Sequence, residues 1–251
     1  MKAMILAAGL GTRLRPLTND RPKALVEVAG HTLLEITLRR LASFGIREVV
    51  VNVHHFADMV VDLLKRNGNF GMQIEISRED DLLLDTGGGL KKAAWFFLQD
   101  GASDEPFLVH NVDVISTVDL ESMLQFHRDG DALATLAVQR RATSRQLLFD
   151  DSNRNQLCGR QTGQNAPEMV CDAARTVAFA FSGIHVISPK LLTMLDEKNV
   201  FSIITTYLRL AGDGQRIQAF PADEYYWRDL GKPEHIAQVS AEIQQGRVIL
   251  P

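Results

Sequence analysis

The stretch that decides the fold follows the first apolar segment and reads Leu6-Ala7-Ala8-Gly9-Leu10-Gly11-Thr12-Arg13-Leu14-Arg15-Pro16. The four residues from Ala3 to Leu6 are short and apolar, as expected of a buried strand. The glycines after them let backbone amides approach phosphate oxygens, while Arg13 and the nearby Lys23 supply positive charge. This is not a Walker loop, since no Gly-Lys-Ser/Thr ends it, and Leu14 replaces the third glycine of a dinucleotide fingerprint. We expect another kind of phosphate-binding turn; the alternative is a glycine-rich turn with solvated arginines.

Outward from this turn, short β-rich apolar segments alternate with segments of helical period. The expected strands are 3–6, 49–53, 72–76, 107–109, 132–138 and 176–186, and the expected helices are 33–42, 56–64, 90–98, 119–127, 201–210 and 233–244. Gly45 stands where a glycine would end the first helix, and Asp119 where a side chain would cap another. The alternation predicts a doubly wound α/β fold with a mixed, mainly parallel sheet and helices on both faces.

The length of 251 residues is compatible with one large α/β domain, and we expect a single domain over 1–251. Residues 140–175 differ from the rest, because they are polar, rich in Asn and Gln and weakly periodic. We expect a peripheral hairpin or excursion there.

Composition excludes several function classes. The net charge is −4 and the lysines and arginines are dispersed, so the sequence predicts no basic patch that would bind nucleic acid. No apolar stretch approaches the length that spans a bilayer, and the first residues do not resemble a secretory segment, so we expect a soluble, cytoplasmic protein without membrane partners. Cys158 and Cys171 lack metal-ligand spacing and are expected to be ordinary reduced thiols.

Two further segments carry candidate site residues. Asp85-Thr86-Gly87-Gly88-Gly89-Leu90 is expected as a loop before a helix, where glycines permit the close approach of a flat group. Asn111-Val112-Asp113 follows an apolar strand, which places Asp113 at a carboxyl end of the sheet, where open α/β proteins bind ligands. A carboxylate there can hold magnesium.

The first segment, together with Pro22-Lys23-Ala24-Leu25, resembles the signature of the sugar-1-phosphate nucleotidylyltransferases, which have a GT-A-like fold. The resemblance implies that Lys23 bridges the α-phosphate and the sugar phosphate, and that cations there neutralise charge as pyrophosphate departs. It also implies a triphosphate site formed by Leu6, Ala8, Gly9, Gly11, Thr12 and Arg13. Gly87 and Gly88 become candidates for nucleobase contacts, with Glu79 beside them.

The resemblance extends to the metal site. Trp227-Arg228-Asp229-Leu230-Gly231-Lys232-Pro233-Glu234 is similar to a family segment whose aspartate is the second metal ligand. Asp113 and Asp229 are therefore expected to hold Mg²⁺, and Arg13, Lys23 and Asp113 to be catalytic. One departure is Val112, because the family usually has glycine before the first aspartate.

On the sugar side, Phe181-Ser182-Gly183-Ile184 resembles the corresponding segment of N-acetylmuramate-1-phosphate uridylyltransferases. Asn111, Ser182 and Gly183 are the candidate sugar-binding residues. The Glu-Lys pair that many members carry is absent between Leu157 and Val177, and Arg160 or Arg175 is considered as a substitute.

The expected activity couples a nucleoside triphosphate, UTP or GTP, to a sugar 1-phosphate. Transfer to N-acetylmuramate 1-phosphate is the first hypothesis, and mannose- or heptose-1-phosphate guanylyltransferases are close alternatives. A nucleotide-binding regulatory module without turnover and transfer to phosphocholine remain as rivals; the latter needs an aromatic cage, for which Tyr225, Tyr226 and Trp227 are considered. Assembly as a homodimer is left open.

Overall fold

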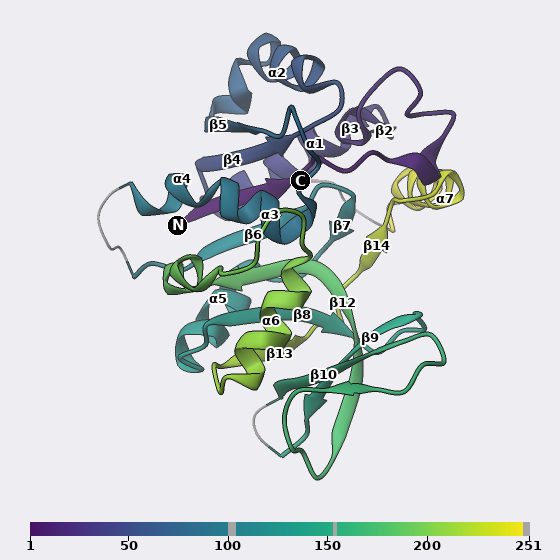
Figure 1. The fold of residues 1–251 in the computed structure, drawn as a ribbon. Helices are drawn as coiled ribbons and strands as arrows, with labels where there is room; N and C mark the ends of the chain where they lie inside the picture. The colour runs from purple at the N-terminus through teal and green to yellow at the C-terminus, as the bar shows by residue number, and fades with distance from the viewer. Residues whose placement is uncertain (100–103, 153–154, 248–251) are drawn as a thin grey trace.

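A ten-stranded sheet organises the computed structural model, which describes residues 1–99, 104–152 and 155–247 (Figure 1). Nine strands lie side by side in the order β11 (Glu168–Met169), β10 (Gln156–Thr162), β13 (Ile217–Pro221), β8 (Ala134–Gln139), β12 (Thr176–Ile187), β6 (Phe107–Asn111), β1 (Lys2–Leu6), β4 (Glu48–Val53) and β5 (Gln73–Arg78). The tenth, β9 (Arg145–Asp150), pairs with β10 and β12.

The amino-terminal half of the sheet is parallel. β1 lies between β4 and β6, and β5 follows outside β4, all in parallel register. The chain runs from β1 to β4 and β5 on one side before it returns to β6 on the other. The order of the strands therefore reverses between the carboxyl ends of β1 and β6, at Leu6 and Asn111, which is where open α/β sheets bind ligands.

Helices cover both faces of the sheet, as predicted. Ala3 and Ile5 of β1 point to one apolar cluster and Met4 points to the other, in the alternation that a strand imposes. The first cluster packs under α1 (Leu33–Ser43), α2 (Ala57–Arg66), α5 (Leu120–Asp129) and α7 (Pro233–Gln244). The second packs under α3 (Asp85–Lys92), α4 (Ala94–Leu98), the 3₁₀ segment η4 (Pro189–Met194) and α6 (Ile203–Gly212).

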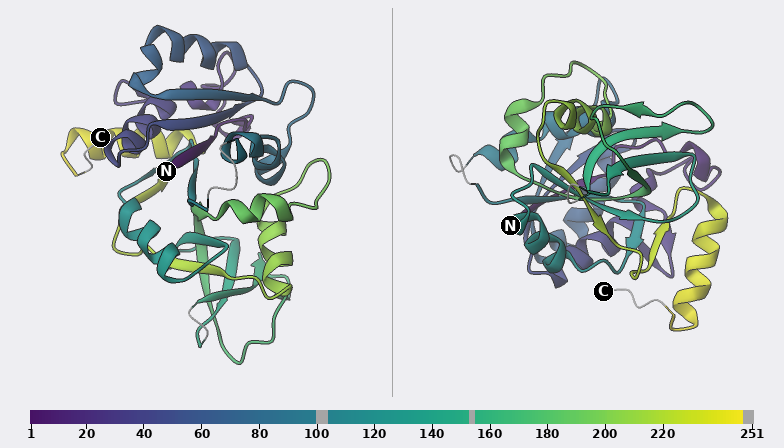
Figure 2. Two further views of the ribbon diagram at one scale, coloured as in Figure 1. Left: turned by 90° about the vertical axis from the view of Figure 1, so that its left-hand side faces the viewer. Right: turned by 90° about the horizontal axis from the view of Figure 1, so that it is seen from below.

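Local signals place several helix ends. Gly45 adopts φ +74° just beyond α1, as predicted for a glycine that ends a helix. The Asp119 side chain caps α5 by accepting from the amides of Glu121 and Ser122. Helix α7 begins at Pro233 and packs beside the hairpin of β2 (Glu27–Val28) and β3 (His31–Thr32), which returns the carboxyl-terminal segment to the amino-terminal half (Figure 2).

The sheet is mixed, but the expectation that it is mainly parallel is wrong. Only four pairings are parallel, while six are antiparallel. The reason is β12, whose twelve residues pair antiparallel with β6, β8 and β9. The segment 140–175 does form a hairpin, but β9 and β10 extend the main sheet instead of lying apart from it.

The expectation of two reduced thiols is also wrong, because Cys158 and Cys171 form a disulfide. β10 and β11 pair antiparallel, so the chain just beyond β11 returns to β10 and the Val170 amide donates to the Cys158 carbonyl at 2.8 Å. The two Cα atoms are consequently 4.9 Å apart despite a sequence separation of 13. None of the described helices is long and apolar enough to cross a membrane.

Candidate active site at the strand-order reversal

A cavity of ≈ 370 Å³ opens at the carboxyl ends of β1, β4 and β6, where the strand order reverses. Six predicted site residues line it: Leu6, Ala8, Gly9, Lys23, Asn111 and Asp113. The remaining lining residues are Asn52, Leu83, Asp85, Thr86, Val112 and Val200. The fold thus brings the first glycine segment and the Asn111–Asp113 segment to one site, as predicted.

The glycine turn is shaped by two different requirements. Gly11 adopts φ +62°, which disfavours any side chain, and an added Cβ would lie 3.0 Å from Thr18 Cγ2 and 3.1 Å from Lys23 Cβ. Gly9 has open space around its missing Cβ. A ligand can therefore approach the backbone at Gly9, while Gly11 brings the turn against Lys23.

The turn also borders a second cavity of ≈ 500 Å³, lined by Leu10, Thr12, Arg15, Thr18, Asn19 and His55. Thr12 belongs to this side of the turn and does not line the first cavity. Thr12 and Gly9, both expected in the triphosphate site, therefore border different cavities.

Lys23 and Asp113 form an ion pair between Nζ and Oδ2, although 90 residues separate them in the chain. Their side chains are only 12% and 14% exposed, so the pair is largely withdrawn from bulk water. Val112 does not disturb this corner, because it is buried and its amide donates to the Leu6 carbonyl at 3.1 Å.

The second predicted metal ligand lies beside the first. Strand β14 (Trp227–Asp229) pairs antiparallel with β7 (Val114–Ser116), which sets Asp229 opposite Val114, and the Leu230 amide donates to the Asp113 carbonyl at 2.8 Å. Asp229 Oδ1 accepts from the Gly231 amide at 2.8 Å. Arg13 Nη2 and Asp229 Oδ1 both lie 2.6 Å from the position that a Cβ at Gly231 would occupy, so Gly231 leaves room for both groups.

The carboxylates fit magnesium by their chemistry. The described residues contain no group of three or more His, Cys, Asp or Glu side chains that could hold a metal. Magnesium is commonly held by one or two carboxylates together with substrate phosphates and water, whereas a closed protein cage would need more ligands. Asp113 and Asp229 match that requirement when a polyphosphate is present.

The glycines of the second segment have a different place from the one predicted. They lie inside α3, which begins at Asp85, and neither Gly87 nor Gly88 lines the cavity. A Cβ at Gly87 would collide with the Phe201 ring, and one at Gly88 would lie 2.9 Å from the Asn199 carbonyl. These glycines let the 195–202 segment cross the start of the helix, while Asp85 and Thr86 reach the cavity.

Glu79 is likewise not on the cavity. It is 1% exposed and accepts from Asn52 Nδ2 at 2.7 Å and from the Leu84 amide at 2.8 Å. Asn52 in turn accepts from the Ala7 amide at 2.7 Å. Glu79 therefore orients Asn52 against the glycine turn, and Asn52 is the polar residue that lines the site. The sequence signal for Asn52 was a polar residue inside an otherwise apolar strand.

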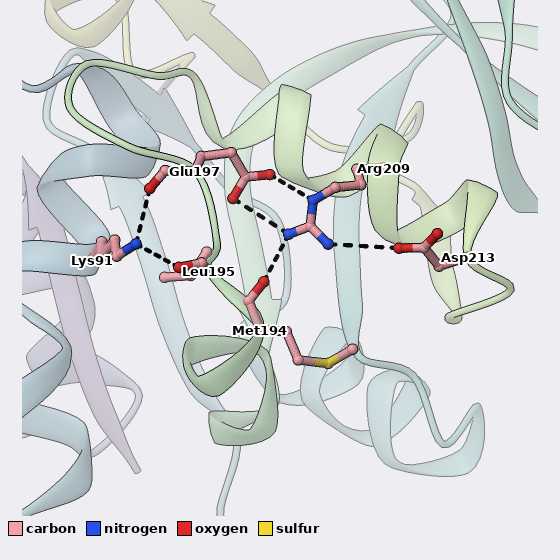
Figure 3. A network of polar contacts seen from close by, with 6 residues as sticks. All are labelled: Lys91, Met194, Leu195, Glu197, Arg209 and Asp213. Carbon is pink, nitrogen blue, oxygen red and sulfur yellow. Dashed lines mark hydrogen bonds and ion pairs between the residues drawn. The ribbon is translucent and has the colours of Figure 1, made fainter.

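The 195–202 segment is fastened by two cations from flanking helices (Figure 3). Lys91 Nζ donates to the carbonyls of Leu195 and Glu197, at 2.5 and 2.8 Å. Arg209 donates to the Met194 carbonyl at 2.7 Å and pairs with the Glu197 carboxylate at 2.9 Å. These contacts hold the segment whose Val200 lines the cavity, a residue that sequence reasoning missed.

The sugar-side candidates lie behind the cavity wall. Gly183 has φ +75°, and a Cβ there would lie 2.8 Å from Asn111 Nδ2, so this glycine allows Asn111 to pack closely. Ser182 is 1% exposed, and its carbonyl accepts from Trp227 Nε1 at 2.7 Å. Of the three candidates only Asn111 lines the cavity; Ser182 and Gly183 support it from behind.

The structure does not support two alternatives considered from the sequence: Arg160 or Arg175 as a substitute cation, and an aromatic cage for phosphocholine. Arg160 pairs with Glu168 at 2.7 Å and Arg175 with Asp151 at 3.2 Å, both in the β9–β11 region. Neither lines the site. The aromatic cage is not formed either, since the Arg141 guanidinium lies 3.6 Å from the Trp227 ring centroid and the Tyr226 hydroxyl bonds to Glu242.

A doubly wound sheet with a cavity at its strand-order reversal, a glycine turn, a lysine and two aspartates on adjoining segments defines a protein that handles phosphates of a nucleotide. Comparison with known proteins gives the family. The family model described as "Nucleotidyl transferase" matches residues 2–147, more than half of the chain. The chain belongs to the nucleotidyl transferase family, as its first motif predicted.

Individual relatives are similar over most of the chain. It is 37% identical over 250 residues to the N-acetylmuramate alpha-1-phosphate uridylyltransferase of Caulobacter vibrioides, covering 96% of this chain and 95% of that protein. It is 28% identical over 236 residues to a mannose-1-phosphate guanyltransferase of Yarrowia lipolytica, covering 93% of this chain but 61% of that protein.

Solved structures show the same fold. The crystal structure of HddC from Yersinia pseudotuberculosis complexed with GMP-PN superposes with a TM-score of 0.72 at 21% identity, covering 96% of this chain and 99% of that one. The inositol-1-phosphate CTP transferase from T. maritima has a TM-score of 0.73 at 16% identity, covering 98% and 96%.

Proposed function

We propose that this protein transfers a uridylyl group from UTP to N-acetylmuramate 1-phosphate and releases pyrophosphate, with Mg²⁺ as cofactor. The observation that carries the proposal is the Lys23–Asp113 pair on the cavity beside the glycine turn, with Asp229 held on the adjoining strand β14. The choice of base and sugar is supported by the 37% identity to the uridylyltransferase, which extends over nearly the full length of both chains.

In this reaction an oxygen of the sugar phosphate attacks the α-phosphorus of the triphosphate. The bond from that phosphorus to the bridging oxygen breaks, and pyrophosphate leaves with the electron pair. The protein needs no nucleophile, so its work is positioning and neutralisation of charge. Lys23 lies on the cavity where it can contact phosphate oxygens, and Arg13 approaches from the Asp229 side.

Asp113 and Asp229 would hold Mg²⁺, which when bound neutralises and orients the phosphates. Until a substrate arrives, the ion pair with Lys23 neutralises Asp113. The lysine is thereby kept beside the position of the phosphates.

The other end of the cavity suits a nucleobase. Leu83 and Val200 provide apolar walls, and Asn52, fixed by Glu79, provides a polar group. Gly9 leaves room for the nucleotide between this end and Lys23. Gly87 and Gly88 act indirectly, because they allow the 195–202 segment to carry Val200 to the cavity.

Guanylyl transfer to mannose or heptose 1-phosphate is the second candidate. It is favoured by the mannose-1-phosphate guanyltransferase relatives, whose identity to this chain is lower, at 28% for the Yarrowia protein. Both candidates use the same chemistry and differ in the walls of the cavity.

The test is a matrix of the four ribonucleoside triphosphates and dTTP against N-acetylmuramate, N-acetylglucosamine, mannose, heptose and glucose 1-phosphates, read by pyrophosphate release. We expect the highest kcat/KM for UTP with N-acetylmuramate 1-phosphate. A maximum for GTP with mannose or heptose 1-phosphate would support the second candidate. Triphosphate binding without turnover for any pair would instead support a regulatory module.

A further inference from the structure

The proposed acceptor brings a phosphate to a side of the site where the chain lacks the expected lysine. Arg160 and Arg175, the substitutes considered from sequence, are occupied by acidic partners in the hairpin region. Lys23 lies beside the glycine turn, at the position proposed for the triphosphate. The acceptor phosphate therefore needs a cation from another part of the fold.

Arg141 does not itself line the ≈ 370 Å³ cavity, but it joins the two segments behind the wall that carries Asn111. It follows β8, and its guanidinium lies over the Trp227 ring with Cζ 3.6 Å from the centroid. Its Nη2 donates to the Phe181 carbonyl at 2.7 Å. Trp227 stands two residues before Asp229 in β14, and Phe181 directly precedes Ser182, so Arg141 lies between the metal-site strand and the segment behind Asn111.

The charge of Arg141 is left without a carboxylate partner. No ion pair is formed by this guanidinium within the described residues, and its Nε is buried without a hydrogen-bond partner there. Burial lowers the pKa of Arg141, and the nearby Asp229 carboxylate opposes that effect. A partly buried guanidinium without a carboxylate partner is costly, and an anionic ligand beside it would reduce that cost.

We propose that Arg141 binds the phosphate of the sugar 1-phosphate and so takes the place of the lysine that this chain lacks. The inference rests on the proposed function. The guanidinium of Arg141 presents a planar fork of donors that suits phosphate oxygens, and its orientation is fixed. Stacking on Trp227 and the bond to Phe181 hold the guanidinium in one orientation beside the strand that carries Asp229.

The experiment compares Arg141→Gln, Arg141→Lys and Arg140→Gln with the unaltered protein in the best substrate pair of the matrix. Gln keeps a flat amide that can donate to Phe181 but removes the charge, whereas Lys keeps the charge and loses the fork. Arg140 is the matched control, since it is the adjacent arginine and its guanidinium lies over Phe179, 5.3 Å from the centroid.

We expect Arg141→Gln to raise the KM for the sugar 1-phosphate by about 10- to 100-fold, the range expected for a lost charged hydrogen bond. The KM for the triphosphate should stay within about twofold, because that ligand binds through other groups. Arg141→Lys should show a smaller rise in the acceptor KM, and Arg140→Gln none. Thermal unfolding of each variant reports whether the fold is intact.

Three results would overturn the inference. One is that Arg141→Gln and Arg141→Lys both raise the KM for both substrates and lower the Tm to the same extent. This would show that Arg141 only stabilises the fold. Another is an unchanged acceptor KM in folded Arg141→Gln. If Arg141→Gln does not fold, an unchanged KM for the sugar 1-phosphate in folded Arg141→Lys would also overturn the inference. Absence of turnover in the unaltered protein would remove the proposed function first, and the acceptor role with it.

Discussion

The two halves of the sheet differ in how they are built and in what they contribute. In the amino-terminal half, β1, β4, β5 and β6 run parallel, and their carboxyl ends present the cavity residues Leu6, Asn52 and Asn111. In the carboxyl-terminal half, β12 pairs antiparallel with three strands, and a disulfide closes the hairpin region. The parallel strands align the ends that border the cavity, whereas the antiparallel half supports the wall behind Asn111.

The reactive residues of the proposed site therefore lie at the carboxyl ends of the parallel strands. The second half of the sheet is stabilised by contacts between segments far apart in sequence. Lys23 and Asp113 come from loops after the first and fourth parallel strands, but Asp229 reaches them only because β14 pairs with β7. A substitution at the carboxyl ends of the parallel strands should therefore affect turnover, and one in the second half stability or acceptor binding.

The largest effect is expected for Asp113→Asn. The amide keeps the size of the side chain but removes the negative charge that pairs with Lys23 and that would hold magnesium. We expect kcat to fall by about 10²- to 10³-fold, the size typical for loss of one electrostatic contact in a transition state. Initial rates of pyrophosphate release measure it.

Asp129→Asn is its control, because this exposed carboxylate at the end of α5 bonds only to Gln125 among the contacts of the described residues. It should retain full activity. A rate of Asp113→Asn within about threefold of the unaltered protein would contradict the assigned role.

A smaller effect, on stability alone, is expected when the disulfide is removed. The crosslink closes a loop with a sequence separation of 13, so Cys158→Ser with Cys171→Ser should lower the free energy of unfolding by about 3 kcal/mol. Urea unfolding with and without reductant measures it, with kcat unchanged because the hairpin does not line the cavity. Reductant should weaken only the protein with both cysteines; equal curves for all four samples would refute the crosslink.

Gly87→Ala separates packing from nucleobase binding. The added methyl group would meet the Phe201 ring, and overpacking of this kind costs about 1–3 kcal/mol, partly offset by the helix propensity of alanine. We expect a lowered urea midpoint and, in the double variant with Phe201→Leu, partial recovery. A raised KM for the triphosphate without loss of stability would show instead that Gly87 contacts the base.

The last prediction concerns the pH dependence of stability, because it applies only below neutral pH. Burial, aided by Arg128, lowers the pKa of His127 from 6.5 to about 4 in the folded protein, where the ring bonds to Thr135 and Ser188. The unfolded chain binds the proton first, so the stability associated with neutral His127 is complete above pH 6.5 and is lost as the pH falls from 6.5 to about 4.

His127→Gln should remove about 1.4 kcal/mol per pH unit from the slope of unfolding free energy in that window. Urea unfolding at several pH values measures the slope of both proteins, and the values near pH 7.5 serve as the reference. An identical slope for the variant would mean that His127 titrates alike in the folded and unfolded chains.

Much of the amino-terminal half was predictable because its signals are local. Apolar alternation, Gly45 and Asp119 placed strands and helix ends within a few residues of their observed bounds. Helix α7 was predicted with its observed bounds, because Pro233 marks its start. The strands β13 and β14 were not predicted, since both are short and their neighbours in the sheet lie far away in sequence.

In the candidate site, too, residues with a local sequence signal were predicted and those that depend on long-range contacts were not. The glycine turn, Lys23 and Asp113 were assigned from a motif, and the structure brings them together. Gly87 and Gly88 were candidates for nucleobase contacts, and in the structure their missing side chains face Phe201 and Asn199; a missing side chain looks the same in sequence whichever neighbour requires it. Asn52 was missed since its partners, Ala7 and Glu79, follow other strands of the sheet.

By itself the sequence determined the alternation of strands and helices, several helix ends and the family signature at the glycine turn. These depend on side chains within a few residues of one another, whose periodicity and turn chemistry act locally. The tertiary structure alone decided that β12 makes half of the sheet antiparallel, that Cys158 meets Cys171, and that Arg141 lies on Trp227. Each of these contacts joins segments whose attraction depends on the whole chain having folded, and no local pattern encodes it.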